Sequence, residues 1–146
     1  MNKSPVLLVE DDENDIFFFQ RAAEKANWEQ PLRIVRDGDE AIAYLHGDGT
    51  FADREQSPLP CLIVLDLNLP QKHGLEVLQW IRASAPDPAV PVVVLTSSTS
   101  DLNANSYLNK PSHPDAMVEI LRTFKAYWFG LNRVPPPCAN EALARV

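Results

Sequence analysis

Short apolar runs alternate along this chain with longer segments in which apolar residues recur at helical spacing. The runs lie at residues 6–9, 32–35, 61–65 and 92–95, and residues 106–109 form a fifth segment of strand length. Strands of this length that alternate with helical segments are typical of βαβ units, whose strands form a parallel sheet. Every side chain of residues 61–65 is apolar, as expected for a central strand that is buried on both faces. The pattern therefore predicts an α/β domain.

Polar residues mark where the predicted helices begin and end. Asp12 precedes the first helical segment, as an N-cap does. Asp37 and Glu40 have the spacing of a capping box at the start of the second helix, which is predicted to end at Gly47. A third helix is expected after Gly74. The apolar positions that indicate the first helix are Ile16, Phe19, Ala23 and Ala26.

The last helix is predicted to begin within residues 112–115. Ser112 and Asp115 again have capping-box spacing, and Pro114 suits the first helical turn. Three consecutive prolines follow at 135–137, so we expect one domain over residues 1–130 and an extended or disordered tail over 131–146. The apolar stripe of the last helix consists of Met117, Ile120, Leu121, Phe124 and Trp128.

Only residues 97–105 separate the fourth predicted strand from the fifth. A crossover between parallel strands normally takes roughly a dozen or more residues and includes a helix. Nine extended residues span about 30 Å, which is enough to run back along a short strand but leaves no room for a packed helix. The fifth strand therefore either returns to the sheet through a bare loop or leaves the sheet.

Polar side chains follow four of the predicted strands. Glu10 and Asp11 follow the first strand, Asp66 the third, Thr96 the fourth and Lys110 the fifth. The carboxyl ends of parallel strands meet at one edge of a sheet, where open α/β folds build their sites. Clustered carboxylates suit a hard divalent cation, and an aspartate can accept a phosphoryl group as a nucleophile. A lysine and a hydroxyl would then bind the phosphoryl oxygens.

Each of these residues also has a purely structural interpretation. The acids at 10–12 suit the positive end of a helix, Asp66 suits an Asx turn before Pro70, and Lys110 suits one half of an ion pair. Tyr107 suits half-buried packing in a strand. The ordered set at successive strand ends, rather than any single residue, favours a site for a cation and a phosphoryl group.

Four segments make the chain resemble the receiver domains of two-component response regulators over roughly residues 4–130. They are residues 9–12, residues 64–70 with Gly74, residues 95–97 and residues 107–111. The resemblance implies a flavodoxin-like, doubly wound, five-stranded parallel sheet with the strand order 2-1-3-4-5. Family members normally have a helix between strands four and five, which the short link leaves out here. The long loop before strand three and the residues after the last helix resemble stand-alone regulators encoded with bacterial phytochromes.

The same resemblance assigns roles to individual residues. It implies that Asp66 is the phosphoacceptor, that Lys110 is the counter-ion of the phosphoryl group, and that Thr96 and Tyr107 form a switch pair. It also implies a cis peptide bond before Pro111. The residues implied to bind Mg²⁺ are Glu10, Asp11, Asp66 and Asn68, the last through its backbone carbonyl.

Composition narrows the class of protein. The net charge of −7, with no basic stripe, argues against binding to nucleic acid. No apolar run approaches the roughly 20 residues of a membrane span, and the N-terminus does not have the pattern of a signal peptide, so a cytoplasmic protein is expected. The two cysteines, Cys61 and Cys138, do not make a disulfide framework. The three histidines, His46, His73 and His113, lack metal-ligand spacing.

The main hypothesis is a single-domain response regulator that is not an enzyme. It would accept a phosphoryl group on Asp66 from a histidine kinase, with a bacteriophytochrome of light signalling as one candidate, and act in a phosphorelay through protein–protein contacts. One alternative is an aspartate-nucleophile phosphatase of haloacid dehalogenase type, although Asn68 stands where those enzymes have a second aspartate. Another is a scaffolding receiver independent of phosphorylation. The short link also predicts a homodimer that exchanges residues 106–129.

Overall fold

The computed structural model describes residues 4–96, 106–111 and 113–126. Five strands and four α-helices lie in the predicted places, with β3 beginning one residue later and β4 ending one residue later than expected. The elements are β1 (Val6–Val9), α1 (Glu13–Lys25), β2 (Leu32–Val35), α2 (Gly38–His46), a 3-10 turn (Gly49–Phe51), β3 (Leu62–Leu65), α3 (Gly74–Ser84), β4 (Val92–Thr96), β5 (Ser106–Asn109) and α4 (Pro114–Phe124).

All five strands pair in parallel in one sheet with the order β2-β1-β3-β4-β5, so the predicted fold is confirmed. The strand β5 pairs with β4 of its own chain. Of the two alternatives for the fifth strand, the structure therefore has the one in which it joins the sheet. The link of residues 97–105 and the tail of residues 131–146 lie outside the described residues.

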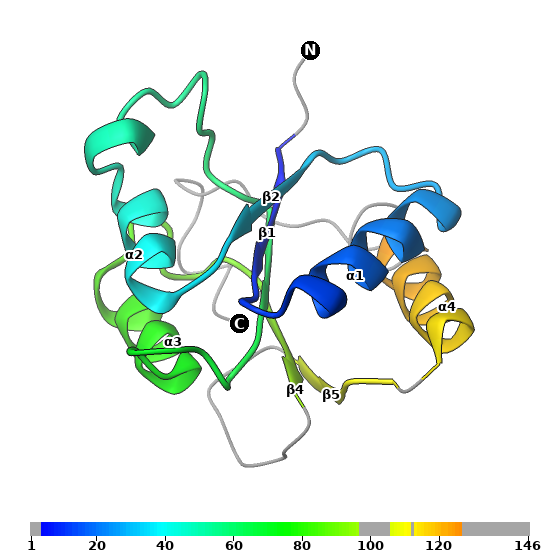
Figure 1. Cartoon of the computed structure of the whole chain (residues 1–146). Helices are drawn as coiled ribbons and strands as arrows, with labels where there is room; N and C mark the ends of the chain where they lie inside the picture. The colour runs from blue at the N-terminus through cyan, green and yellow to red at the C-terminus, as the bar shows by residue number, and fades with distance from the viewer. Residues whose placement is uncertain (1–3, 97–105, 112, 127–146) are drawn as a thin grey trace.

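Helices cover both faces of the sheet in three layers, with α2 and α3 on one face and α1 and α4 on the other (Figure 1). The central strand β3 contributes to both cores, because Ile63 and Leu65 pack under α2 and α3 while Leu62 and Val64 pack under α1 and α4. None of the described helices is long and apolar enough to cross a membrane.

The helix starts follow the predicted polar residues in the first half of the chain. The Asp12 carboxylate accepts backbone N–H bonds from Asn14 and Asp15 at the start of α1, which confirms the N-cap. At α2, Asp37 accepts a bond from the Glu40 N–H, as predicted. The return bond of the capping box differs, because the Glu40 carboxylate accepts from the N–H of the residue before the cap, at position 36.

The start of α4 corrects the prediction of a capping box at Ser112, which lies outside the described residues. The N-cap is His113, and its side chain accepts no hydrogen bond from the helix. Pro114 occupies the first helical position, as predicted. Because proline presets the helical φ angle and has no N–H, it fixes the helix start at its own position.

Arg54 joins the long loop before β3 to the end of α2. Its guanidinium donates to the carbonyls of Tyr44 and Leu45, in the last turn of α2, and to the carbonyl of Ser57 in the loop. The Tyr44 hydroxyl donates to the carbonyl of Pro58. The carbonyls at a helix C-terminus lack partners within the helix, so these bonds satisfy groups that would otherwise need solvent.

Candidate phosphoryl and metal site

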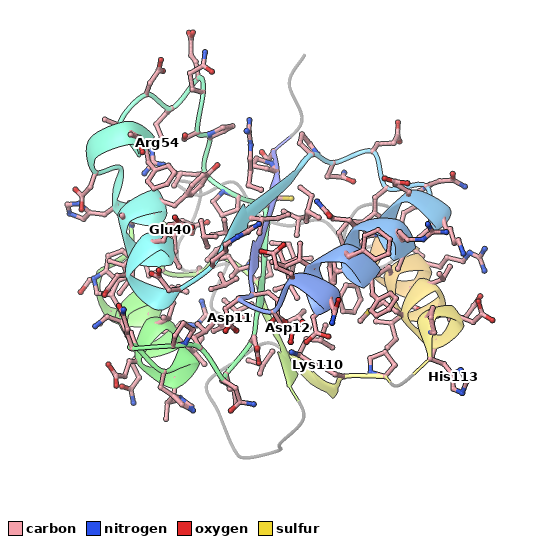
Figure 2. All side chains as sticks on the ribbon, in the orientation of Figure 1. Asp11, Asp12, Glu40, Arg54, Lys110 and His113 are labelled. Carbon is pink, nitrogen blue, oxygen red and sulfur yellow. The ribbon has the colours of Figure 1, made fainter. Side chains whose placement is uncertain are left out.

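Three acids meet at the carboxyl edge of the sheet, as predicted from the ends of the strands. Val9 of β1 is in register with Leu65 of β3, so the residues that follow them lie side by side. One carboxylate oxygen from each of Glu10, Asp11 and Asp66 lies within 4.8 Å of the other two. Asp11 is exposed, whereas Glu10 and Asp66 each have a relative exposure of 4%. Figure 2 shows Asp11 and Lys110 at this same edge of the sheet.

The backbone after Asp66 is shaped by a close approach from α3. The Asp66 carboxylate accepts a hydrogen bond from the backbone N–H of Asn68 at 3.1 Å, so the predicted Asx-type contact is present as well. The Gly74 N–H donates to the Leu67 carbonyl. A Cβ atom on Gly74 would lie 2.4 Å from the backbone oxygen of Asp66. Only glycine therefore allows α3 to start directly against the backbone of this aspartate.

The ammonium group of Lys110 contacts three carboxylates at once. Its Nζ atom lies 2.7 Å from Asp15 Oδ2, 2.9 Å from Glu10 Oε1 and 3.2 Å from Asp66 Oδ2. A lysine ammonium has three N–H donors. All three can thus be engaged in the structure, each with a different acid.

Burial and neighbouring charges shift the pKa values of Glu10 and Lys110. Burial raises the pKa of the Glu10 carboxyl to about 7, and the charge of Asp66 raises it too, while the hydrogen bond from Lys110 lowers it. For Lys110 the largest single effect, burial, lowers the pKa, but the hydrogen bonds to Asp15 and Glu10 and the charges of Glu10 and Asp66 outweigh it and raise the pKa overall. The lysine is therefore charged at neutral pH, and the Glu10 carboxyl holds its proton more tightly than an ordinary glutamate does.

Asp15 was not among the residues predicted for the site. It lies in the first turn of α1, where the helix dipole favours acids whether or not they belong to a site. The signal that could have revealed it is its place immediately before Ile16, whose buried side chain turns this side of α1 toward the sheet. Its contact with Lys110 joins residues that are 95 positions apart.

The family of the chain follows from comparison with known proteins. The model of the response regulator receiver domain matches residues 6–122. The chain belongs to the response regulator receiver family. The predicted resemblance is confirmed.

Two relatives match this receiver over most of their length. It is 38% identical over 142 residues to the probable methanogenesis regulatory protein FilR2 of Methanothrix harundinacea, with 90% of this chain and 88% of FilR2 covered. It is 35% identical over 138 residues to the response regulator Rcp1 of Synechocystis, with 89% of this chain and 92% of Rcp1 covered.

Solved receiver structures have the same fold. The response regulator RPA3017, in red light signaling of R. palustris, has a TM-score of 0.85 and 29% identity, with 92% of this chain and 99% of that chain covered. The phosphorylated cyanobacterial phytochrome response regulator RcpA has a TM-score of 0.82 and 34% identity, with 91% and 99% covered. The Mn²⁺-bound form of Rcp1 has a TM-score of 0.79 and 34% identity, with 92% and 100% covered. The similarity to phytochrome-linked regulators, predicted from the sequence, is confirmed.

The remaining predicted residues of the receiver are placed by their backbone only. In the sheet Thr96 pairs with Asn109, and Tyr107 pairs with Val94. The side chains of Thr96 and Tyr107 lie outside the described part of the structure, so their switch role stays a prediction. The peptide bond between Lys110 and Pro111 is trans, since the described residues contain no cis peptide bond, and the expected cis bond was wrong.

The donor set of the site fits a divalent cation. Three oxygen donors lie within coordinating range of one another, and hard cations such as Mg²⁺ take oxygen ligands. The four acids around the site, with Asp15 included, outnumber the single Lys110 ammonium. An additional positive charge would therefore relieve repulsion that the lysine alone does not compensate.

Proposed function

We propose that this receiver accepts a phosphoryl group on Asp66 from a phosphohistidine of a sensor kinase and acts as a signalling switch. The observation that supports this most directly is the buried Asp66 carboxylate, which lies 3.2 Å from the Lys110 ammonium and within 4.8 Å of two further acids. A lone buried aspartate would be costly, but one that faces a lysine and a cation site is suited to bind phosphoryl oxygens.

In the proposed reaction an oxygen of Asp66 attacks the phosphorus atom of the phosphohistidine. The new bond joins that oxygen to phosphorus, and the bond between phosphorus and the imidazole nitrogen breaks. The electron pair leaves with the imidazole, which takes up one proton from solvent and ends neutral, while Asp66 becomes an acyl phosphate. Each transfer consumes the acceptor, so the receiver is modified stoichiometrically and is not an enzyme.

We propose Mg²⁺ as the cation of this site. Glu10, Asp11 and Asp66 would hold it with their carboxylates, together with the backbone carbonyl of Asn68. The bound ion would offset the negative charge of the phosphoryl oxygens. Lys110 would contribute a second positive charge beside the acceptor, and its raised pKa keeps that charge at neutral pH.

The partners follow from the relatives and from the charge of the chain. One similar structure is that of a response regulator in red light signaling, and another is that of a phytochrome response regulator. These similarities support a histidine kinase of the bacteriophytochrome class as the phosphoryl donor. The net charge of −7 disfavours nucleic acid as a target. Output through protein–protein contacts, in a cytoplasmic phosphorelay, follows from this proposal.

A homodimer that exchanges residues 106–129 is part of the proposal. The strand β5 lies at the edge of the sheet, and nine residues connect it to β4. In the structure β5 pairs with β4 of its own chain. Domain swapping would place the identical strand of a partner in the same position, and a short connection favours such an exchange. Light scattering at micromolar concentration, with and without beryllium fluoride and Mg²⁺, tests this, and a monomer under both conditions would contradict it.

Phosphoryl transfer is tested with a radiolabelled histidine kinase and an Asp66→Asn variant. The wild-type chain is expected to gain an alkali-labile label, and the variant is expected to gain none, because an amide does not form the acyl phosphate. Asp39→Asn removes an exposed acid from α2, outside the cluster, and should be labelled like wild type. Equal label on wild type and Asp66→Asn would contradict the proposal and favour a scaffolding receiver.

A further inference from the structure

Asp15 makes the shortest contact to the lysine of the site, yet it lies outside the acidic cluster. Its Oδ2 atom is 2.7 Å from Lys110 Nζ, compared with 3.2 Å for Asp66. The group of acids that could share a cation consists of Glu10, Asp11 and Asp66 and does not include Asp15. The interaction of Asp15 with the site therefore passes through the ammonium group.

The three N–H donors of Lys110 are matched by three carboxylates, so a fourth acceptor competes with one of them. A phosphoryl group on Asp66 would bring three strong acceptor oxygens and nearly two negative charges to the position that Lys110 reaches. Glu10 belongs to the cation cluster, and a bound cation would compensate it. Asp15 lies outside that cluster, and among the described residues its ion-pair partner is Lys110.

The surroundings allow the ammonium to change partners. The Asp15 side chain has a relative exposure of 41%, so water can replace the lysine as its partner at little cost. A cavity of about 100 Å³ adjoins the pair and is lined by Asp15, Lys110, Phe18 and Pro111 among others. The lysine stem can therefore shift without repacking of the core.

We infer that Asp15 is a positioning residue that draws the Lys110 ammonium toward α1 and competes with the phosphoryl group on Asp66 for it. Asp15 thereby lowers the affinity of the site for a phosphoryl group. This inference rests on the proposed function of Asp66. It adds a residue that adjusts how tightly the site binds the phosphoryl group.

The test measures binding of beryllium fluoride, in the presence of MgCl₂, by isothermal titration calorimetry. Asp15→Asn removes the carboxylate charge with almost no change of shape, and it should bind the probe about fivefold more tightly than the matched control, as expected for loss of one partly exposed ion pair. The control is Glu13→Gln, which removes an equal charge from the same helical turn. Glu13 pairs with Arg36, not with Lys110.

Two further variants show that the effect acts through the lysine. Asp15→Glu keeps the charge and should restore an affinity close to that of wild type. In a Lys110→Ala background, Asp15→Asn and Glu13→Gln should have the same effect on binding. A second readout needs no cation: acetylation of Lys110 in the metal-free protein, followed by mass spectrometry, should be faster in Asp15→Asn than in Glu13→Gln.

The outcomes separate this inference from the proposed function. If wild type binds the probe and Asp15→Asn binds it no more tightly than Glu13→Gln, the positioning role of Asp15 is wrong and the function of Asp66 stands. If wild type itself neither binds the probe nor accepts label from the kinase, the proposed function fails and the inference fails with it.

Discussion

The acids and the lysine of this site come from different parts of the sheet and are positioned by different kinds of contact. Glu10 and Asp66 follow the central strands β1 and β3, whose neighbours on both sides fix the backbone, and Gly74 packs against the backbone of Asp66. Lys110 follows the edge strand β5, and its ammonium forms ion pairs with three carboxylates. The position of the acceptor thus depends on backbone packing, whereas that of its counter-ion depends on the carboxylates with which it pairs.

The largest effect on the free energy of unfolding is expected where the backbone packs most closely around Asp66. Gly74→Ala places a Cβ atom 2.4 Å from the oxygen of Asp66 and 2.6 Å from the Cα of Leu67. Because both contacts are with backbone, we expect a loss of about 2–3 kcal/mol in the free energy of unfolding, measured by urea denaturation.

Gly49→Ala is the control for this variant. Gly49 has a φ of 56°, and a Cβ atom at this position would meet no other atom within 4 Å, so the variant tests backbone conformation without a clash. Alanine there is expected to cost only about 1 kcal/mol. An equal loss in both variants would mean that close packing against Asp66 is not what matters.

Glu10 provides a test through pH. Its pKa is raised from 4.5 to about 7 in the folded chain, so the folded state binds more protons than the unfolded state between these values. Stability from this group is fully present below about pH 4.5 and is lost as the pH rises through about 7, by about 2 kcal/mol between pH 5 and 7.5. Metal-free wild type should therefore lose stability between pH 5 and 7.5 relative to Glu10→Gln, which stays neutral. Parallel pH profiles for the two proteins would contradict the raised pKa.

The contact of α4 with Trp28, which lies just after α1, supports the half of the molecule that carries Lys110. The indole N–H of Trp28 donates to the Leu121 carbonyl of α4 at 2.7 Å, and its ring lies against Phe19 and Phe124. Trp28→Phe keeps an aromatic ring but loses this bond, so we expect a loss of about 1 kcal/mol in thermal or urea unfolding.

Trp80→Phe serves as the matched control on the opposite face. Trp80 packs against the other core, and none of the described residues accepts a hydrogen bond from its indole N–H. Its replacement should cost less than that of Trp28. The reverse order would show that the bond to Leu121 does not stabilise α4.

The smallest effect on the free energy of unfolding is expected from changes at the starts of helices. His113 provides no side-chain bond to α4, so His113→Asp should add a cap and raise the free energy of unfolding by about 0.5–1 kcal/mol. Asp12→Ala, at the start of α1 on the same face of the sheet, should lower it by about 1 kcal/mol, because Asp12 already caps α1. Urea denaturation of both variants compares the two helix starts directly, and a destabilised His113→Asp would contradict the comparison.

The sequence predicted the acidic half of the site well and the lysine's surroundings only in part. Glu10 and Asp66 were predictable because strand ends in a parallel sheet coincide, and this depends only on the pattern of apolar runs. The contact between Lys110 and Asp15 was not, because it depends on the path of a long side chain between two elements. Similarly, the hydrogen bond that the Glu40 carboxylate accepts depends on local geometry, and it comes from the N–H at position 36 rather than from that of Asp37.

Arg54 has a practical consequence for experiments on this protein. It bonds the loop before β3 to the last turn of α2, and it lies far from Asp11 and Lys110 in Figure 2. The loop and the helix end should therefore open together in hydrogen exchange, as one cooperative unit. The exposed neighbours Glu55 and Gln56 then offer an attachment point for a fluorophore or a surface linker, at a rigid place remote from the chemistry.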